Sequence, residues 1–311
     1  ISFDKEIQIE GLYFEDKELI IRRVKTALQN GKHIILVGPP GTGKSKLAKE
    51  ICRSFGADFK MATATSDWST YETIGGYQPK KDGTLKFRPG IFLECFKDAE
   101  TMMPLNKWLI IDEMNRADID KAFGALFSAL TGDEVTLNFH SESGHPIVLR
   151  PQKGSERAER NDYEYIIPGD WRLIGTMNTI DKASLYEMSY AFMRRFAFIS
   201  VGVPKRIDSG LVDKFLETWG INEYPYTETL AYIWKQINQY RAIGPAIAED
   251  LARFTAVDGD FTSALILYVL PEFEGLREDL IRSFIAQLEP LDEIDTGLLT
   301  AFVEDFFQMQ G

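Results

Sequence analysis

Three short stretches of this sequence combine residue types that could bind phosphate, hold a metal ion and activate water. The first, GPPGTGKS at residues 38–45, matches the pattern G-x-x-x-x-G-K-[ST] between an apolar run and a helix-like pattern. Glycines let backbone N–H groups approach phosphate oxygens without a Cβ clash, and the helix N-terminus adds partial positive charge. Lys44 can reach outer phosphates, and Ser45 can bind Mg²⁺. We therefore predict a nucleotide-binding loop formed by Gly38, Pro39, Pro40, Gly41, Thr42, Gly43, Lys44 and Ser45.

The second stretch, WLIIDE at residues 108–113, places two acids at the end of an apolar run. Asp112, at the tip of the predicted strand, can hold Mg²⁺ directly or through water. Glu113 follows it and is placed to orient and deprotonate an attacking water molecule. Two acids at a solvated strand end also occur by chance. The phosphate-type loop upstream favours the catalytic interpretation, in which Ser45 and Asp112 are the metal ligands.

The third stretch, MNTIDKASL at residues 177–185, has an Asn and an Asp three positions apart, which fits either a guanine reader or a sensor of the outer phosphate. An Asn-x-x-Asp guanine reader also needs Lys after the Asn, and this chain has Thr179 there. The predicted strand that ends at Asn178 should lie beside the strand that ends at Asp112. We therefore interpret Asn178 as a phosphate sensor. Asp181 would support the water site or the start of a helix, where Ser184 and Glu187 have capping-box spacing.

Three arginines are further candidates. Arg116 follows the two acids closely and is either an ordinary surface residue or a contact to phosphate across a subunit boundary; both interpretations stay open. Arg194 and Arg195 precede a predicted strand at a helix end, where cations complement the helix dipole. We favour a catalytic role for this pair, stabilising negative charge on the nucleotide of a neighbouring subunit.

Apolar runs at residues 33–37, 107–112, 171–178 and 196–201 predict strands that alternate with helices. Strands that are apolar throughout and alternate with helices are typical of a parallel sheet covered on both faces, so we predict an α/β fold. One helix carries its apolar residues at four-residue spacing, and a second is predicted to run as one piece to a stop near Gly132. These apolar residues are Leu47, Ile51 and Phe55 in the first helix and Phe123, Leu126, Phe127 and Leu130 in the second.

The pattern changes from about residue 208, where the sequence becomes a series of helical segments separated by Pro245 and Pro271. We therefore predict an α/β domain over residues 1–207 and a helical domain over 208–311. Two stretches of the first domain, 75–90 and 135–151, have hairpin-like patterns, the former around an Asp-Gly turn. Such insertions often carry specific contacts, although solvated loops without function are the alternative.

Composition excludes several classes of protein. Hydrophobic residues make up 44% and charged residues 26%, which indicates a folded chain. A net charge of −12 argues against a protein that binds nucleic acid over its whole surface, but it allows a local basic patch. Cys52 and Cys95 fit buried, reduced thiols, and three histidines make a zinc site improbable. With no apolar run of membrane-spanning length, we expect a cytoplasmic protein. Because the chain opens on Ile1, we expect a fragment that leaves room for a preceding domain.

The order of these segments resembles the AAA+ ATPases. Within that class the chain looks most like the branch that contains McrB, the motor of a methylcytosine-specific restriction system, with the MoxR chaperones as further relatives. The similarity covers roughly residues 10–205 and rests on NRA after the acids, MNT-x-D-K-A, the double arginine before Phe196, and GGYQP…FRPGIF. Over residues 208–311 it rests on helical character alone.

The resemblance implies a P-loop NTPase fold with a helical lid and a role for each motif. Residues 38–45 would be the Walker A loop, Asp112 and Glu113 Walker B, Asn178 sensor 1, and Arg194 or Arg195 a finger acting on a neighbour's nucleotide. A finger supplied by a neighbour implies a ring, commonly a hexamer, whose pore or partners the hairpins would face. One departure is notable: Ala246 and Ile247 follow the Gly-Pro turn at which many AAA+ lids carry a sensor-2 arginine, so we assign no such residue.

The leading expectation is an oligomeric ATPase with Mg²⁺ as cofactor that remodels or translocates a macromolecule. Its substrate is either DNA, as in a McrB-like GTP-dependent translocase, or protein, as in a MoxR-like chaperone. A second class of function is a nucleotide-gated scaffold whose hydrolysis awaits an activating partner subunit; a small-molecule P-loop kinase is a distant third. We favour ATP, keep GTP as the alternative because McrB is a GTPase, and expect base choice to lie around residues 11–14 and in the lid.

Overall fold

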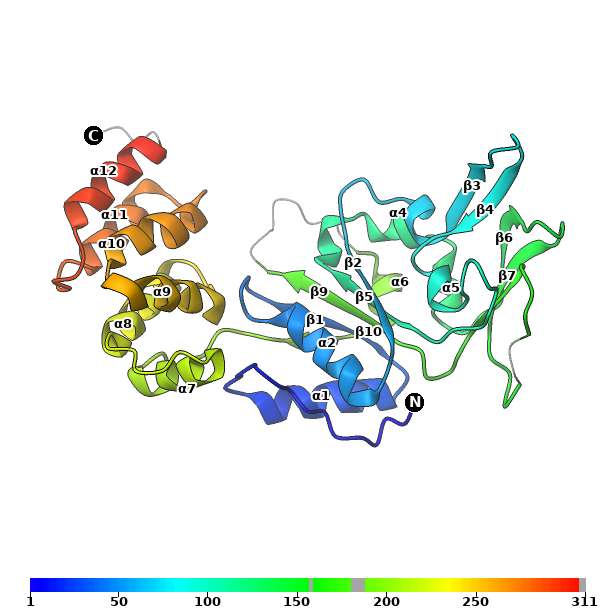
Figure 1. The fold of residues 1–311 in the computed structure, drawn as a ribbon, viewed down its shortest axis with the longest axis horizontal. Coiled ribbons are helices and arrows are strands. Elements are labelled where there is room, and N and C mark those ends of the chain that lie inside the picture. Colours follow the sequence, from blue (N-terminus) through cyan, green and yellow to red (C-terminus); the bar gives the residue numbers. More distant parts are fainter. Residues whose placement is uncertain (157–158, 180–187, 308–311) are drawn as a thin grey trace. The chain divides into compact units, whose positions relative to one another are not determined.

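Five strands form the central sheet of the computed structural model, which describes residues 1–156, 159–179 and 188–307. Their order across the sheet is β10-β1-β9-β5-β2, and the pairings of β10 with β1, β5 with β9 and β2 with β5 are parallel (Figure 1). Helices flank this sheet, so the predicted α/β fold is confirmed. The strands are β1 (His33–Gly38), β2 (Phe59–Thr63), β5 (Trp108–Asp112), β9 (Leu173–Asn178) and β10 (Phe196–Ser200).

The sheet forms because its inner strands are apolar and fully covered. In β1 and β5 the residues from Ile34 to Leu36 and from Trp108 to Ile111 have no solvent exposure, as expected for parallel strands between helices. Helix α2 packs against β5 and β9 through the predicted face, in which Leu47, Ile51 and Phe55 are buried. The helices of this part are α1 (Lys17–Gln29), α2 (Lys44–Phe55), α3 (Thr70–Thr73), α4 (Ile119–Phe123), α5 (Leu126–Ala129) and α6 (Tyr190–Met193).

Two elements differ from the sequence-based prediction. Strand β2, FKMAT, was not predicted because it is an edge strand whose residues are half-buried or exposed, so it lacks an apolar run. The single helix predicted up to Gly132 was wrong: it consists of two short helices, α4 and α5, separated at Gly124. There the backbone (φ 13°, ψ −95°) leaves the helical region, and the N–H of Gly124 closes the first helix on the carbonyl of Asp120.

Both predicted hairpins are present, and each is an insertion on the α/β scaffold. Strands β3 (Gly75–Pro79) and β4 (Leu85–Pro89) pair antiparallel. Strands β6 (Val135–His140) and β7 (Pro146–Pro151) do the same, and β8 (Glu164–Ile167), which was not predicted, joins β7 in parallel. The two hairpins lie side by side (Figure 1), and the ring of Phe139 contacts those of Tyr77 and Phe87, with centroids 5.5 and 5.0 Å apart.

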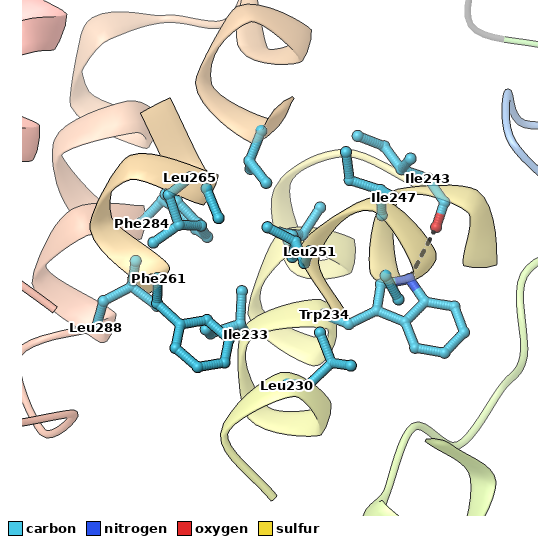
Figure 2. Packing of buried hydrophobic residues seen from close by; sticks show 14 of the residues in the cluster. Leu230, Ile233, Trp234, Ile243, Ile247, Leu251, Phe261, Leu265, Phe284 and Leu288 are labelled. Atoms are coloured by element: carbon cyan, nitrogen blue, oxygen red, sulfur yellow. Dashed lines mark hydrogen bonds between the residues drawn. The ribbon is translucent and has the colours of Figure 1, made fainter. Parts of the chain in front are cut away.

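From Ser209 on, the described chain consists mainly of helices. Its helices are α7 (Ser209–Trp219), α8 (Thr227–Tyr240), α9 (Pro245–Asp258), α10 (Phe261–Ala264), α11 (Glu278–Gln287) and α12 (Thr296–Phe306). They enclose an apolar core to which Leu230, Trp234, Leu251, Phe261 and Phe284 contribute (Figure 2). No helix within the described residues is both long and apolar enough to cross a membrane.

The chain divides into two compact units, and the division is not a single cut near residue 207. Residues 1–10, 18–37 and 44–200 form the first unit, which holds the sheet and the hairpins. Residues 11–17, 38–43 and 201–311 form the second, which holds the helical region. The second unit therefore also includes six residues of the predicted phosphate loop, which contact the helical region through their backbone.

Candidate nucleotide-binding site

The loop at residues 38–43 has the backbone that its glycines permit. Gly41 and Gly43 adopt φ angles of 71° and 81°, a region that favours glycine. A Cβ at Gly38 would lie 1.9 Å from the carbonyl oxygen of Val201, so only glycine fits there. The hydroxyl of Thr42 donates to the carbonyl of Pro39 at 3.0 Å, which closes the loop on itself. The loop thus has a backbone that depends on its glycines at positions 38, 41 and 43, and its role in binding phosphate stays a prediction.

Lys44 and Ser45 start α2 in the first unit, next to the carboxyl end of β5. The hydroxyl of Ser45 donates to Oδ1 of Asp112 at 2.5 Å, so the two predicted metal ligands are in direct contact. Lys44 is 6% exposed. Burial lowers the pKa of Lys44 to about 8, against the opposing attraction of Asp112 and Glu113.

Thr176 joins the two acids and was missed by the sequence analysis. Because Ile111 of β5 pairs with Gly175 of β9, the next residues along each strand face each other. The Thr176 hydroxyl donates to Asp112 Oδ1 at 2.5 Å and accepts from the backbone N–H of Glu113 at 3.0 Å. The available signal was its place two residues before Asn178, which puts both side chains on one side of β9.

Glu113 has a strained backbone conformation, and its carboxylate contacts two side chains. Its backbone is left-handed (φ 51°, ψ 43°), which costs a non-glycine residue about 1–2 kcal/mol. The Asn178 amide donates to Glu113 Oε1 at 3.3 Å, and Arg116 pairs with Oε2 at 2.8 Å. The structure thus brings the predicted acid and sensor together, and it gives Arg116 a contact within its own subunit.

Asn115, the first residue of the NRA stretch, was given no role of its own from the sequence. It is 1% exposed, and both polar atoms of its side chain lack a hydrogen-bond partner among the described residues. Buried amides in native proteins are nearly always satisfied, so an unsatisfied one calls for an explanation. Its position two residues after Glu113 makes Asn115 a further candidate site residue.

The two arginines after α6 have different surroundings. Arg195 is held by its own chain: Nε donates to the carbonyl of Phe127 at 2.9 Å, Nη1 donates to Ala191, and the guanidinium lies over the Phe127 ring. Arg194 is exposed, and within the described residues its guanidinium makes no hydrogen bond or ion pair. Of the predicted pair, Arg194 is the one available to another molecule.

Residues 11–14, where base choice is expected, and two arginines of the helical region, Arg241 and Arg253, lie in the second unit. Leu12 would lie 3.0 Å from a Cβ on Gly43, and the Tyr13 ring packs on Phe215 of α7, so this segment contacts both the loop and the lid. Arg241 donates to the carbonyls of Glu272 and Glu274, and Arg253 pairs with Glu249 at 2.7 Å. Both arginines are thus bound within the lid.

The proposed helix start at Ser184 and Glu187, and Asp181 before it, lie outside the described residues. Asn178 is the last residue of β9 and lies within the described residues, so its contact with Glu113 does not depend on the segment that follows.

The fold and these contacts define a phosphate-loop nucleotide-binding protein, and comparison with known families gives its class. Residues 33–196 match the model of the AAA domain (dynein-related subfamily), which spans more than half of the chain. The chain therefore belongs to the AAA family, within its dynein-related subfamily. Membership makes it a nucleotide-hydrolysing enzyme.

Two relatives are components of restriction enzymes. The EcoKMcrB subunit of the type IV methyl-directed restriction enzyme of Escherichia coli K12 is 29% identical over 189 residues, which are 59% of this chain and 38% of that protein. Component YdiS of the type II restriction enzyme BsuMI of Bacillus subtilis is 28% identical over 195 residues, covering 53% and 55%. The Lon protease of Metamycoplasma arthritidis is 25% identical over 232 residues, covering 71% and 25%. The matched residues make up between a quarter and about half of each relative's length. The resemblance to McrB is confirmed.

Proposed function

We propose that this chain is the motor part of an oligomeric AAA+ NTPase that uses hydrolysis to remodel or translocate a macromolecule. The observation that carries the proposal is the contact network around the two acids. Ser45 and Thr176 converge on Asp112, and Asn178 and Arg116 converge on Glu113. Such a network preorganises the groups that water activation needs.

The chemistry is in-line attack of water on the γ-phosphorus. Glu113 takes a proton from the water, the new P–O bond forms, and the bond to the bridging oxygen breaks to release the nucleoside diphosphate. Asn178 orients the water, and Lys44 with the loop amides neutralises phosphate charge. Ser45 and Asp112 offer a hydroxyl and a carboxylate 2.5 Å apart, hard oxygen donors that suit Mg²⁺. Mg²⁺, when bound, supplies positive charge to the outer phosphate oxygens.

Ring formation is part of the proposal because, among the described residues, neither Arg194 nor Arg195 contacts Asp112 or Glu113 of its own chain. Arg195 is bound within its own chain, whereas Arg194 is exposed. A finger at Arg194 therefore acts on a neighbour's nucleotide, and the subunits form a closed ring, with a hexamer as the expected size.

The substrate and the base are the finer parts of the proposal. The names of the two restriction-enzyme relatives favour DNA over protein as the translocated molecule. The absence of an arginine at Ala246 or Ile247 favours a site that an activating partner subunit stimulates, which is the scaffold-like alternative. ATP is the preferred nucleotide and GTP the alternative, with residues 11–14 and the lid around the base.

Hydrolysis of ATP and of GTP, measured with sizing in the presence and absence of a non-hydrolysable analogue, tests the proposal. We expect turnover of one nucleotide and a nucleotide-dependent shift to a ring-sized particle. Assembly with little turnover that rises when DNA or a partner is added would support the gated alternative. A chain that binds neither nucleotide would refute the proposal.

A further inference from the structure

The start of α9 binds the phosphate loop backbone to backbone within the second unit. The N–H of Gly244 donates to the carbonyl of Pro40 at 2.8 Å, and the N–H of Ala246 donates to the carbonyl of Gly41 at 3.1 Å. The lid therefore contacts the loop at the position where a sensor-2 arginine is absent.

The closeness of this contact depends on glycine. A Cβ on Gly244 would lie 2.3 Å from the carbonyl carbon of Gly41, 2.4 Å from its oxygen and 2.5 Å from the nitrogen of Thr42. All three distances are below what real Cβ atoms show, and backbone atoms cannot rotate away as a side chain can. Any larger residue at 244 must push the lid and the loop apart.

The lid segment that makes this contact is itself firmly held. The indole N–H of Trp234 donates to the carbonyl of Ile243 at 3.2 Å (Figure 2), and the N–H of Ile243 donates to the Asn238 side chain at 3.1 Å. Pro245 occupies the first turn of α9, and Ile247 and Leu251 anchor that helix in the lid core. A shift of the loop is thus transmitted to α8 and α9 together.

The contact also involves a peptide unit of the predicted phosphate loop. The carbonyl of Gly41 and the N–H of Thr42 belong to one peptide unit, and a hydrogen bond accepted by the oxygen strengthens the N–H as a donor. We propose that Gly244 is a positioning residue through which the lid raises the affinity of the loop for nucleotide, by backbone contact in place of a sensor-2 side chain. This inference rests on nucleotide binding by the loop.

Two variants break the contact in different ways. Gly244→Ala adds the Cβ that the loop cannot accommodate, and Ala246→Pro removes the N–H that bonds to Gly41, at a helix position where proline is tolerated. The matched control is Gly210→Ala in α7 of the lid, where a Cβ meets nothing closer than 3.6 Å. Titration with a fluorescent ATP or GTP analogue gives Kd, and steady-state hydrolysis gives KM and kcat.

We expect both variants to raise Kd and KM on the order of tenfold while kcat changes less than about threefold, and the control to match the wild type. Loss of folded protein would instead lower binding stoichiometry and kcat without moving Kd. Unchanged Kd in both variants at full binding stoichiometry, with the wild type binding nucleotide, would overturn the inference and leave the proposed function standing. A wild type that binds no nucleotide would remove both.

Hydrogen exchange on the wild type keeps the inference testable should either variant fail to fold. The amides of Gly244 and Ala246 should gain protection when the nucleotide analogue is added, because binding orders the loop that they contact. The amide of Gly210 should not change. Equal exchange with and without the analogue at residues 244 and 246 would overturn the inference.

Discussion

Glu113 combines an unfavourable backbone with two side-chain contacts. A left-handed glutamate persists only where its surroundings over-determine it, and such strain gathers at functional sites. Here the carboxylate is held by Asn178 and Arg116, and its N–H by Thr176. The strained backbone of Glu113 thus occurs where contacts with Asn178 and Arg116 fix the orientation of its carboxylate.

Replacing Glu113 with Gln tests its role as the base. Gln keeps the volume and can still accept from Asn178, but it cannot take a proton from water. We expect kcat to fall by about two to four orders of magnitude with nucleotide Kd nearly unchanged. Glu100→Gln, a change at an exposed glutamate outside the contact network, is the control. Equal hydrolysis by the Glu113 variant and the wild type would remove the assignment.

The lowered pKa of Lys44 gives nucleotide binding a pH dependence. In the nucleotide-free protein, the Lys44 amine is mostly charged below pH about 8 and mostly neutral above it. Bound phosphate favours the charged form, so binding between pH about 8 and 10 should take up a proton, and Kd should rise with pH in that window. Calorimetry in buffers of different ionisation enthalpy measures the uptake.

Lys97 provides the control for that measurement. Its pKa is also lowered to about 8 by burial, but its ammonium bonds to Asn161 and Glu164. It should therefore titrate equally with and without nucleotide. A Kd independent of pH between 7 and 10 would contradict the role given to Lys44.

At the scale of elements, the β3–β4 and β6–β7 hairpins pack against each other. Phe139 bridges Tyr77 and Phe87, the Tyr77 hydroxyl accepts from the N–H of His140 at 2.8 Å, and Lys80 and Lys86 both pair with Glu142. The ion pairs are exposed and contribute little, so the aromatic contacts supply most of the stability of the pairing.

Phe139→Ala should separate the hairpins. Removing a half-buried ring that contacts two others should cost on the order of 2 kcal/mol locally. We expect the amide of His140 to exchange at least tenfold faster, as measured by hydrogen exchange. Leu85→Ala, at a side chain that is 63% exposed, is the control and should leave exchange unchanged. Equal exchange in both variants would show that the hairpins are held by other contacts.

At the scale of the whole molecule, charge is unevenly distributed. Residues 208–311 carry 19 acidic and six basic residues, so the net charge of −12 resides in the helical region and residues 1–207 are close to neutral. An acidic lid repels a phosphate backbone. Under the DNA alternative, contacts to nucleic acid must therefore come from the α/β part.

Complementation between inactive variants tests the ring. Under the proposal, Glu113→Gln lacks the base of its own site, and Arg194→Ala lacks the finger for its neighbour's site. If Arg194 acts in trans, mixing the two restores about a quarter of the interfaces in a randomly assembled ring. We expect hydrolysis to recover to that order. Mixing Glu113→Gln with Lys44→Ala, which both damage their own sites, is the control and should give no recovery.

Recovery in the control mixture, or none in the first, would contradict a finger supplied by the neighbour. Arg195→Ala separates structure from catalysis in the same assay. It removes contacts to Phe127 and Ala191, so it should lower the melting temperature, which Arg194→Ala should leave unchanged.

The sequence by itself determined the α/β class, the inner strands and the groups at their carboxyl ends. Buried parallel strands must be apolar throughout, and the loop at residues 38–45 needs glycines at set spacing, so both leave local signals. The edge strand β2 and the break at Gly124 leave weaker local signals in the sequence. A half-exposed strand needs no apolar run, and a helix can end without a change in the spacing of its apolar residues.

Only the tertiary structure decided which residues meet. Thr176 reaches Asp112 because of the register between β5 and β9, and Arg194 differs from Arg195 through the contacts of the latter with Phe127. The backbone bonds between Gly244–Ala246 and the phosphate loop join segments some 200 residues apart and involve no side chain. Amide and carbonyl groups are the same at every position, so no pattern of residue types can encode such a contact.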